Sequence, residues 1–353
     1  MKNNLDMRIS YFTVLTFLYT IISVAQTKSI NESKFVNIGG IEQWVTIKGD
    51  DINKPAILFL HGGPGSVMSP YCDSIYGNWK KDFILINWDQ RGAGRTFGKN
   101  APKEVNEDYF IENKLTLDRM VKDGVELSEY LLKYLKKKKL VLIGSSWGSI
   151  LGVKMIMKEP SLYQAYIGNA QFVGFMKNYS YAYGTVLKLA EKSNDTIAYK
   201  KLKLLGKPPY KTTRSLGQIL RVVKKYERKN AIRTPVGWWR INPEYDNKKD
   251  KIDRYNGDDY SFLYFAGHKK MGIESIVRGL DFSKEVLKFE VPVYLVQGDE
   301  DILTASQINK SYFNKITAPD KAYYLIKGAG HNLNQFIIDA DYQILKDKIM
   351  FSK

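Results

Sequence analysis

Short apolar runs recur along the chain, and each one stops at a cluster of glycine, polar or charged residues. Continuous apolar runs of about four to eight residues are typical of strands buried on both faces of a parallel sheet. Such strands are expected at 56–60, 83–88, 140–143, 291–296 and 322–326. Residues 35–48 instead alternate apolar and polar side chains around Gly39 and Gly40, which predicts a β-hairpin.

A helical period appears between these runs. From 117 to 135 the apolar residues return every three or four positions, as they do on one face of an amphipathic helix. Further helices are expected between Gly148 and Met157, where Pro160 follows, and from 336 to 350. Strands that alternate with helices predict an α/β fold in which a mostly parallel sheet carries helices on both faces.

One long stretch, residues 172–283, shows helical patterns without strand-like runs. It is too long to be a loop inside a compact domain. We interpret it as an inserted helical cap, which leaves the core near Asn169 and returns near Lys288. The two parts of the core are then 26–171 and 284–353.

The first 25 residues have the layout of a secretory signal peptide. Lys2 and Arg8 precede an uncharged apolar run from 9 to 25, and the small Ser23 and Ala25 predict cleavage after Ala25. We therefore expect export to the periplasm or the exterior. An uncleaved N-terminal membrane anchor is the alternative, because the run is near the lower length limit of a spanning helix.

The composition is that of a globular protein, with 44% hydrophobic and 26% charged residues. The net charge is +17, and residues 172–283 hold 23 Lys or Arg against 11 Asp or Glu. These charges follow no nucleic-acid-binding module, so they predict a solvated basic surface that attracts anionic membranes or polymers peripherally.

Cys72 is the single cysteine, so no internal disulfide is possible. With only three histidines and no ligand spacing, neither a metal nor a cofactor is expected.

The candidate nucleophile is Ser146. Residues 144–148 read Gly-Ser-Ser-Trp-Gly, a G-x-S-x-G pattern between a predicted buried strand and a predicted helix. A serine hydroxyl needs an exposed position and a nearby base, and a strained strand-to-helix turn provides the exposure. Gly144 and Gly148 allow the backbone to turn there without a steric conflict.

A base and an acid follow in the order expected of the fold. Of the three histidines, His331 comes directly after the last predicted strand, where a loop delivers its imidazole to the edge at which catalytic groups collect. The strand at 291–296 is followed by a cluster of carboxylates that could fix the imidazole tautomer. Asp301 is our choice from this cluster, and Asp299 is its rival.

Acyl transfer also needs donors for the oxyanion. The N–H of Trp147, directly after the nucleophile, is one candidate, and the N–H of Gly63 in the glycine-rich loop 61–65 is the other. The loop 89–95 is interpreted as structural, with its charges paired inside the loop.

These residues resemble the prolyl iminopeptidase family of α/β-hydrolases. The family's HGGPG loop matches 61–65, its DQRG-x-G-x-[ST] loop matches 89–96 and its G-x-SWG-x elbow matches 144–149, while Gly298-x-x-Asp301 and Gly330-His331 extend the match beyond the cap. The resemblance implies a serine hydrolase that forms an acyl-enzyme on Ser146.

The activity implied by the resemblance is an aminopeptidase acting on small peptides. Family members hold the substrate amine with cap carboxylates, for which Glu191, Glu227, Glu244 and Glu274 are candidates here. A carboxylic ester hydrolase would use the same triad and is the alternative. A non-catalytic binding protein on the same scaffold is a third hypothesis.

Overall fold

The computed structural model describes residues 28–210 and 212–350. The expected signal peptide, 1–25, and its cleavage site after Ala25 lie outside the described residues. Within them, none of the helices combines the length and the apolarity that a membrane span requires.

The described part of the chain starts with the expected hairpin. Strands β1 (Ile30–Ile38) and β2 (Ile41–Gly49) pair antiparallel. Gly39 and Gly40 form the turn with φ values of 63° and 78°. Two successive positive φ angles match the right-handed twist of the flanking strands, which explains two adjacent glycines.

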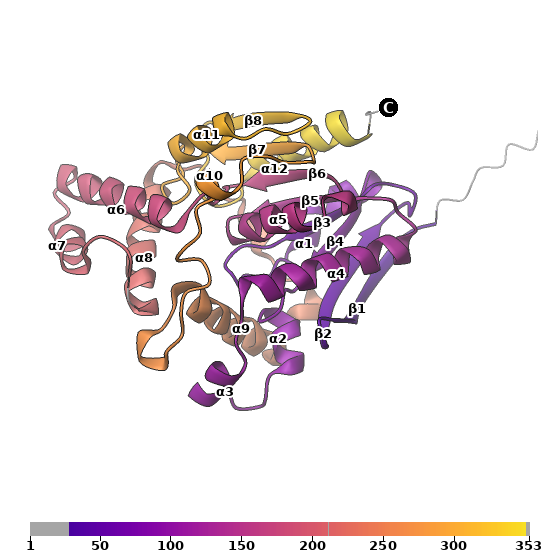
Figure 1. Ribbon diagram of the computed structural model, residues 1–353, viewed down its shortest axis with the longest axis horizontal. Helices are drawn as coiled ribbons and strands as arrows, with labels where there is room; N and C mark the ends of the chain where they lie inside the picture. Colours follow the sequence, from indigo (N-terminus) through magenta and orange to yellow (C-terminus); the bar gives the residue numbers. More distant parts are fainter. Residues whose placement is uncertain (1–27, 211, 351–353) are drawn as a thin grey trace, which may run out of the picture.

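A single eight-stranded sheet forms the centre of the described structure (Figure 1). Its strand order is β1-β2-β4-β3-β5-β6-β7-β8, antiparallel where β2 meets β1 and β4 and parallel elsewhere. The parallel strands are β3 (Ala56–Leu60), β4 (Ile84–Trp88), β5 (Leu140–Ser145), β6 (Tyr163–Asn169), β7 (Val293–Gly298) and β8 (Lys321–Ile326). This arrangement confirms the predicted fold class.

Strand β6 was not expected from the sequence. Its residues, Tyr-Gln-Ala-Tyr-Ile-Gly-Asn, contain no continuous aliphatic run. The strand nevertheless lies at the centre of the parallel region, between β5 and β7, where six of its seven residues are buried. Neighbouring strands on both sides and helices on both faces therefore decide its conformation, rather than its own β-propensity.

Helices cover both faces of the sheet (Figure 1). Successive strand residues point to opposite faces, so Leu58 and Leu142 pack in one apolar cluster while Ile57 and Val141 pack in another. The first cluster includes residues of α4 (Leu117–Leu135) and α5 (Trp147–Lys158), and the second includes residues of α1 (Cys72–Tyr76) and α12 (Gln335–Leu345). The bounds of α4 agree with the predicted helix.

Shorter elements occur both in the core and in the segment 172–283. They are α2 (Gly94–Asn100), α3 (Glu107–Glu112), α10 (Phe282–Glu285), α11 (Ser306–Lys315), single 3₁₀ turns at Gly77–Lys81, Pro160–Leu162, Val236–Trp239, Pro243–Tyr245 and Lys269–Met271, and a π-helical turn at Lys346–Met350. The helix expected at 336–350 thus changes geometry after Leu345.

The segment 172–283, called the cap segment below, contributes no strand to the sheet among its described residues. Its longer helices are α6 (Phe175–Lys192), α7 (Thr196–Leu205), α8 (Thr213–Asn230) and α9 (Lys248–Ala266). Asp195, Thr212 and Asn247 precede three of them and accept hydrogen bonds from the first-turn N–H groups, which fixes where those helices begin. Figure 1 shows α6, α7 and α8 gathered at one end of the sheet.

Candidate active site

Ser146 occupies a strained turn between β5 and α5. Its φ and ψ are 54° and −113°, a region that residues with side chains rarely adopt. A Cβ at Gly144 would lie 2.5 Å from the carbonyl oxygen of Gly148, and one at Gly148 would lie 1.9 Å from that of Leu60. Both glycines are therefore required by close backbone approach, and the turn holds the Ser146 side chain at the edge of a cavity.

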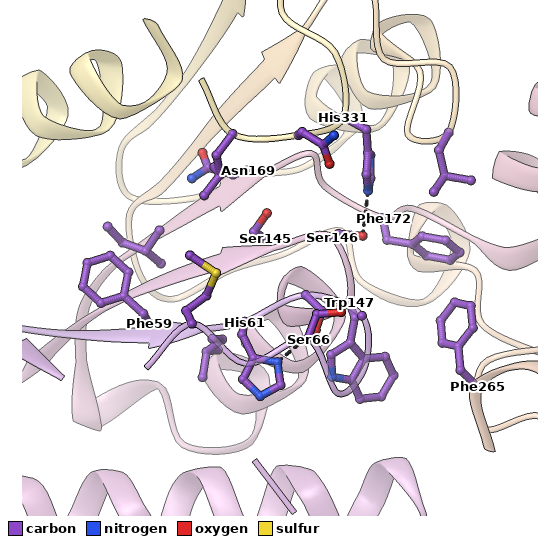
Figure 2. A pocket seen from close by; sticks show the side chains of 18 of the residues that line it. Phe59, His61, Ser66, Ser145, Ser146, Trp147, Asn169, Phe172, Phe265 and His331 are labelled. Carbon is purple, nitrogen blue, oxygen red and sulfur yellow. Dashed lines mark hydrogen bonds between the residues drawn. The ribbon is translucent and has the colours of Figure 1, made fainter. Parts of the chain in front are cut away.

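Two hydrogen bonds connect Ser146 to the predicted base and acid, and Figure 2 shows the one between His331 and Ser146. Nε2 of His331 lies 2.9 Å from Oγ of Ser146, and Nδ1 of His331 lies 2.9 Å from Oδ2 of Asp301. The three residues come from the loops after β5, β7 and β8, which end at the same edge of the sheet. The structure thus brings together Ser146, Asp301 and His331.

The rival carboxylate takes a different position. Asp299 accepts a hydrogen bond from the N–H of Gly328 at 2.6 Å and so braces the loop that carries His331. Asp301 is buried, and its carboxylate also accepts hydrogen bonds from the N–H and hydroxyl of Thr304. Of the two, Asp301 is the one within hydrogen-bond distance of the imidazole.

The charges at this site support an ionised acid beside a basic imidazole. Burial by itself raises the pKa of Asp301, but the neighbouring His331 and the Thr304 hydrogen bonds outweigh it and hold that pKa below its ordinary value. Burial likewise lowers the pKa of His331, whereas Asp301 and then Glu227 raise it, and the net result is a raised pKa. These shifts favour an ionised Asp301 beside an imidazole that binds a proton more readily than usual.

The glycine-rich loop 61–65 lies directly against Ser146. A Cβ at Gly62 would be 3.6 Å from Cβ of Ser146, and Gly63 has a φ of 110° that favours glycine. Gly63 and Trp147, the two predicted oxyanion donors, line the same cavity as Ser146. His61 is buried, and desolvation lowers its pKa to about 4, so it stays neutral. Its side chain points away from Ser146 (Figure 2).

The expectation that the charges of loop 89–95 pair within the loop is wrong. Arg91 forms an ion pair with Asp123 of α4 at 2.6 Å, and Arg95 pairs with Asp250 of α9 at 2.7 Å. The buried Asp89 carboxylate is satisfied instead by uncharged donors, the hydroxyl of Ser69 and the main-chain N–H of Arg95. Both arginine side chains therefore tie the loop to neighbouring helices.

One carboxylate of the cap segment contacts the loops that carry Asp301 and His331. Glu227 of α8 is buried, and its Oε1 accepts a hydrogen bond from the N–H of His331 at 2.7 Å. Its Oε2 accepts one from the N–H of Ile302 at 3.3 Å, next to Asp301. The sequence indicated Glu227 only as a candidate ligand for a substrate amine. Its hydrogen bonds to residues 75 and 104 positions away could not be predicted, because no local sequence pattern marks such contacts.

The cavity beside Ser146 has a volume of about 250 Å³ and is mainly aromatic and aliphatic. Phe59 and Asn169 lie on one side of Ser146 in Figure 2, and Phe172 and Phe265 on the other. Among the described residues, no Asp or Glu lines this cavity, and Lys224 is the lining Lys or Arg side chain. The structure therefore does not bring Glu191, Glu227, Glu244 or Glu274 to the cavity wall.

Metal ligands are not grouped in the part of the chain that the structure describes. Residues 28–210 and 212–350 contain no set of three or more His, Cys, Asp or Glu side chains placed to hold an ion.

Comparison with known proteins agrees with the observed fold. The model of the α/β-hydrolase fold family matches residues 55–335. The Bacillus subtilis protein named "Probable aminopeptidase YbaC" is 26% identical over 322 residues, which span 87% of this chain and 93% of that protein. The proline iminopeptidase of Lactobacillus helveticus is 22% identical over 83% of this chain and 88% of that protein.

Solved structures show the same architecture. The proline iminopeptidase of Mycobacterium smegmatis superposes with a TM-score of 0.59 at 17% identity, covering 85% of this chain and 91% of that one. A proline iminopeptidase-related protein from Thermus thermophilus gives 0.58 at 19% identity, covering 91% and 99%. These findings confirm the resemblance to the prolyl iminopeptidase group, and the chain belongs to the α/β-hydrolase fold family.

Proposed function

We propose that the protein is a serine hydrolase that cleaves acyl bonds through a covalent acyl-enzyme on Ser146. The observation that supports this most directly is the chain of two 2.9 Å hydrogen bonds from Ser146 through His331 to Asp301. A hydroxyl bonded to an imidazole that a carboxylate orients is the arrangement that makes serine nucleophilic near neutral pH.

In acylation, Oγ of Ser146 forms a bond to the substrate carbonyl carbon while its proton passes to Nε2 of His331. The tetrahedral intermediate then breaks its bond to the leaving amine or alcohol, which takes the proton from His331 as it departs. Water repeats the sequence on the acyl-enzyme, giving a proton to His331 and releasing Ser146 with that proton. The net reaction adds one water across the scissile bond.

The oxyanion of each intermediate would accept hydrogen bonds from the N–H groups of Trp147 and Gly63. Trp147 is the first residue of α5, where main-chain N–H groups have no carbonyl partner within the helix. Each such donor lowers the barrier by about 3 to 4 kcal/mol. Asp301 would remain ionised throughout and stabilise the imidazolium.

For the substrate, we propose the amide bond after the N-terminal residue of a small peptide, as in prolyl iminopeptidases. Support comes from relatives that align over more than four fifths of both chains and carry the names aminopeptidase and proline iminopeptidase. A cavity of about 250 Å³ suits one small, apolar residue such as proline.

Ester hydrolysis is the second candidate, and one observation favours it. No carboxylate of the described chain lines the cavity beside Ser146, so the free enzyme offers no direct partner for a substrate ammonium group there. An acyl chain without an amine would meet mainly aromatic and aliphatic walls, which favour burial of apolar groups.

Turnover of proline 4-nitroanilide and of short 4-nitrophenyl esters by the same preparation separates the two candidates. We expect hydrolysis of the anilide and covalent labelling by a fluorophosphonate, both lost in Ser146→Ala. Hydrolysis of the esters alone would refute the aminopeptidase assignment. If wild type neither reacts with the probe nor hydrolyses any of these compounds, the chain is a binding protein on a hydrolase scaffold.

A further inference from the structure

Three cations lie close to the catalytic histidine without partners. Lys224 and Arg228 lie one turn apart on α8, and Arg233 follows in the next loop. All three are exposed. Among residues 28–210 and 212–350, none of the three forms an ion pair or a hydrogen bond. Some other cations of the cap segment are engaged, such as Lys225 with Asp195 and Lys177 with Asp281.

The three cations line two adjoining cavities. Lys224 contributes to the wall of the cavity beside Ser146. Arg228 and Arg233 line a second cavity of about 420 Å³, and the two cavities share Trp239 and Asn332 as common wall residues. A substrate bound at Ser146 therefore reaches the arginines when it extends past these two side chains.

The second cavity lies on the side of the catalytic histidine. Its wall includes Gly330 and Asn332, the two neighbours of His331 in the chain. In the proposed mechanism His331 donates its proton to the leaving group, so the leaving group must lie next to the imidazole when the scissile bond breaks. The part of the substrate beyond that bond is thus directed toward Arg228 and Arg233.

The positive charge of this cavity is only partly offset from within. Glu227 is the carboxylate in its wall, and its single negative charge faces two guanidinium charges, while both of its oxygens already accept main-chain hydrogen bonds from His331 and Ile302. Guanidinium groups match carboxylates in geometry and bind them through two parallel hydrogen bonds. An anionic group is consequently the ligand that the second cavity suits best.

We propose that Arg228 and Arg233, with Lys224 at the junction of the cavities, form a subsite for a carboxylate on the leaving-group side of the substrate. This inference rests on the proposed serine hydrolase function and specifies its substrates. In a short peptide the carboxylate is either the free C-terminus or an acidic side chain after the scissile bond. Both present the same chemistry to the arginines.

The test compares kcat/KM for three dipeptides: prolyl-glycine with a free carboxylate, prolyl-glycinamide and prolyl-glutamate amide. A matched ester pair, 4-carboxyphenyl and 4-carbamoylphenyl acetate, compares an anionic with a neutral leaving group without a peptide bond. We expect each anionic substrate to be preferred over its neutral partner by about tenfold at low salt, the size of one good charge-assisted contact. Preference for the free C-terminus alone, or for the acidic side chain alone, identifies which of the two carboxylates the subsite binds.

The double variant Arg228→Gln/Arg233→Gln should bring the anionic-to-neutral ratio close to 1. The control Arg221→Gln/Lys229→Gln removes the same charge from exposed positions of α8 that line neither cavity, and should keep the wild-type ratio. Added salt should reduce the ratio of wild type, because partly exposed charges are screened.

Equal kcat/KM for the anionic and neutral members in wild type would overturn the subsite, as would a ratio that survives in Arg228→Gln/Arg233→Gln. In either case Ser146-dependent turnover of the neutral members leaves the proposed function standing. Loss of all turnover and of fluorophosphonate labelling in wild type would instead refute the proposed function itself.

Discussion

Replacement of Glu227 tests whether a cap residue supports the catalytic loops. Its side chain is buried and accepts hydrogen bonds from the N–H groups of His331 and Ile302 at 2.7 and 3.3 Å. In Glu227→Ala both donors lose their partner. A buried donor left unsatisfied costs about 1 to 3 kcal/mol. Since the second contact is long, we expect a total loss of about 2 to 4 kcal/mol in the free energy of unfolding.

The stability change is measurable by thermal unfolding. For a chain of this size, 1 kcal/mol corresponds to about 2 to 4 °C in Tm, so Tm should fall by roughly 4 to 16 °C in Glu227→Ala. Glu227→Gln keeps a carbonyl acceptor for the N–H of His331 and should lose less. Glu274→Gln is the control, because that side chain is exposed and contacts neither loop.

A pH profile separates support of the site from support of the fold. Burial lowers the pKa of His331, and the charges of Asp301 and Glu227 raise it. Removing the Glu227 charge therefore lowers that pKa, and the imidazole remains an unprotonated base to lower pH. The acidic limb of kcat/KM in Glu227→Gln should move to lower pH, while that of Glu274→Gln stays in place.

Two results would contradict this account. An acidic limb at the wild-type position in Glu227→Gln would mean that its charge does not act on the imidazole. A Glu227→Ala variant with the same Tm as the wild type would mean that solvent or a rearranged loop satisfies the two N–H groups.

Three further predictions concern single positions. Asp301→Asn should lower kcat about 10⁴-fold by disturbing the imidazole tautomer, whereas Asp299→Asn should change it less than about tenfold, since that side chain only braces a loop. Burial raises the pKa of Asp341 to about 8. Between about pH 4 and 8 the folded state therefore holds a proton that the unfolded state has lost, and the protein loses stability as pH rises through this range. Asp341→Asn should raise Tm at pH 8.5 but hardly at pH 4. If the first 25 residues are a cleaved signal peptide, N-terminal sequencing of the protein from its native host should begin at Gln26, and a retained Met1 would indicate the anchor instead.

Local sequence signals predicted the fold wherever a residue's conformation depends on its neighbours in the chain. Helix α4 matches its apolar period, and the hairpin turn matches its two glycines. The candidate site was equally accessible, because Ser146, Asp301 and His331 each follow a strand whose end is visible as a change from apolar to polar residues.

The remaining features depend on contacts between distant parts of the chain. Strand β6 is held by β5 and β7, and its own residues lack a strand pattern. Arg91 and Arg95 find their partners on α4 and α9, and Glu227 finds its partners on two loops. No periodicity or short motif encodes which of several carboxylates a given donor will reach.

The position of the cap segment in the sheet bears on how this lineage acquires new substrates. The segment departs from β6 and returns to β7, and these strands are direct neighbours. An insertion whose two ends lie side by side can be replaced by another without disturbing the pairing of the sheet. Glu227 limits that freedom, because a replacement cap must again offer an acceptor to the His331 loop. Related proteins with other specificities should therefore keep a hydrogen-bond acceptor beside the His331 loop even where the rest of the cap segment has diverged.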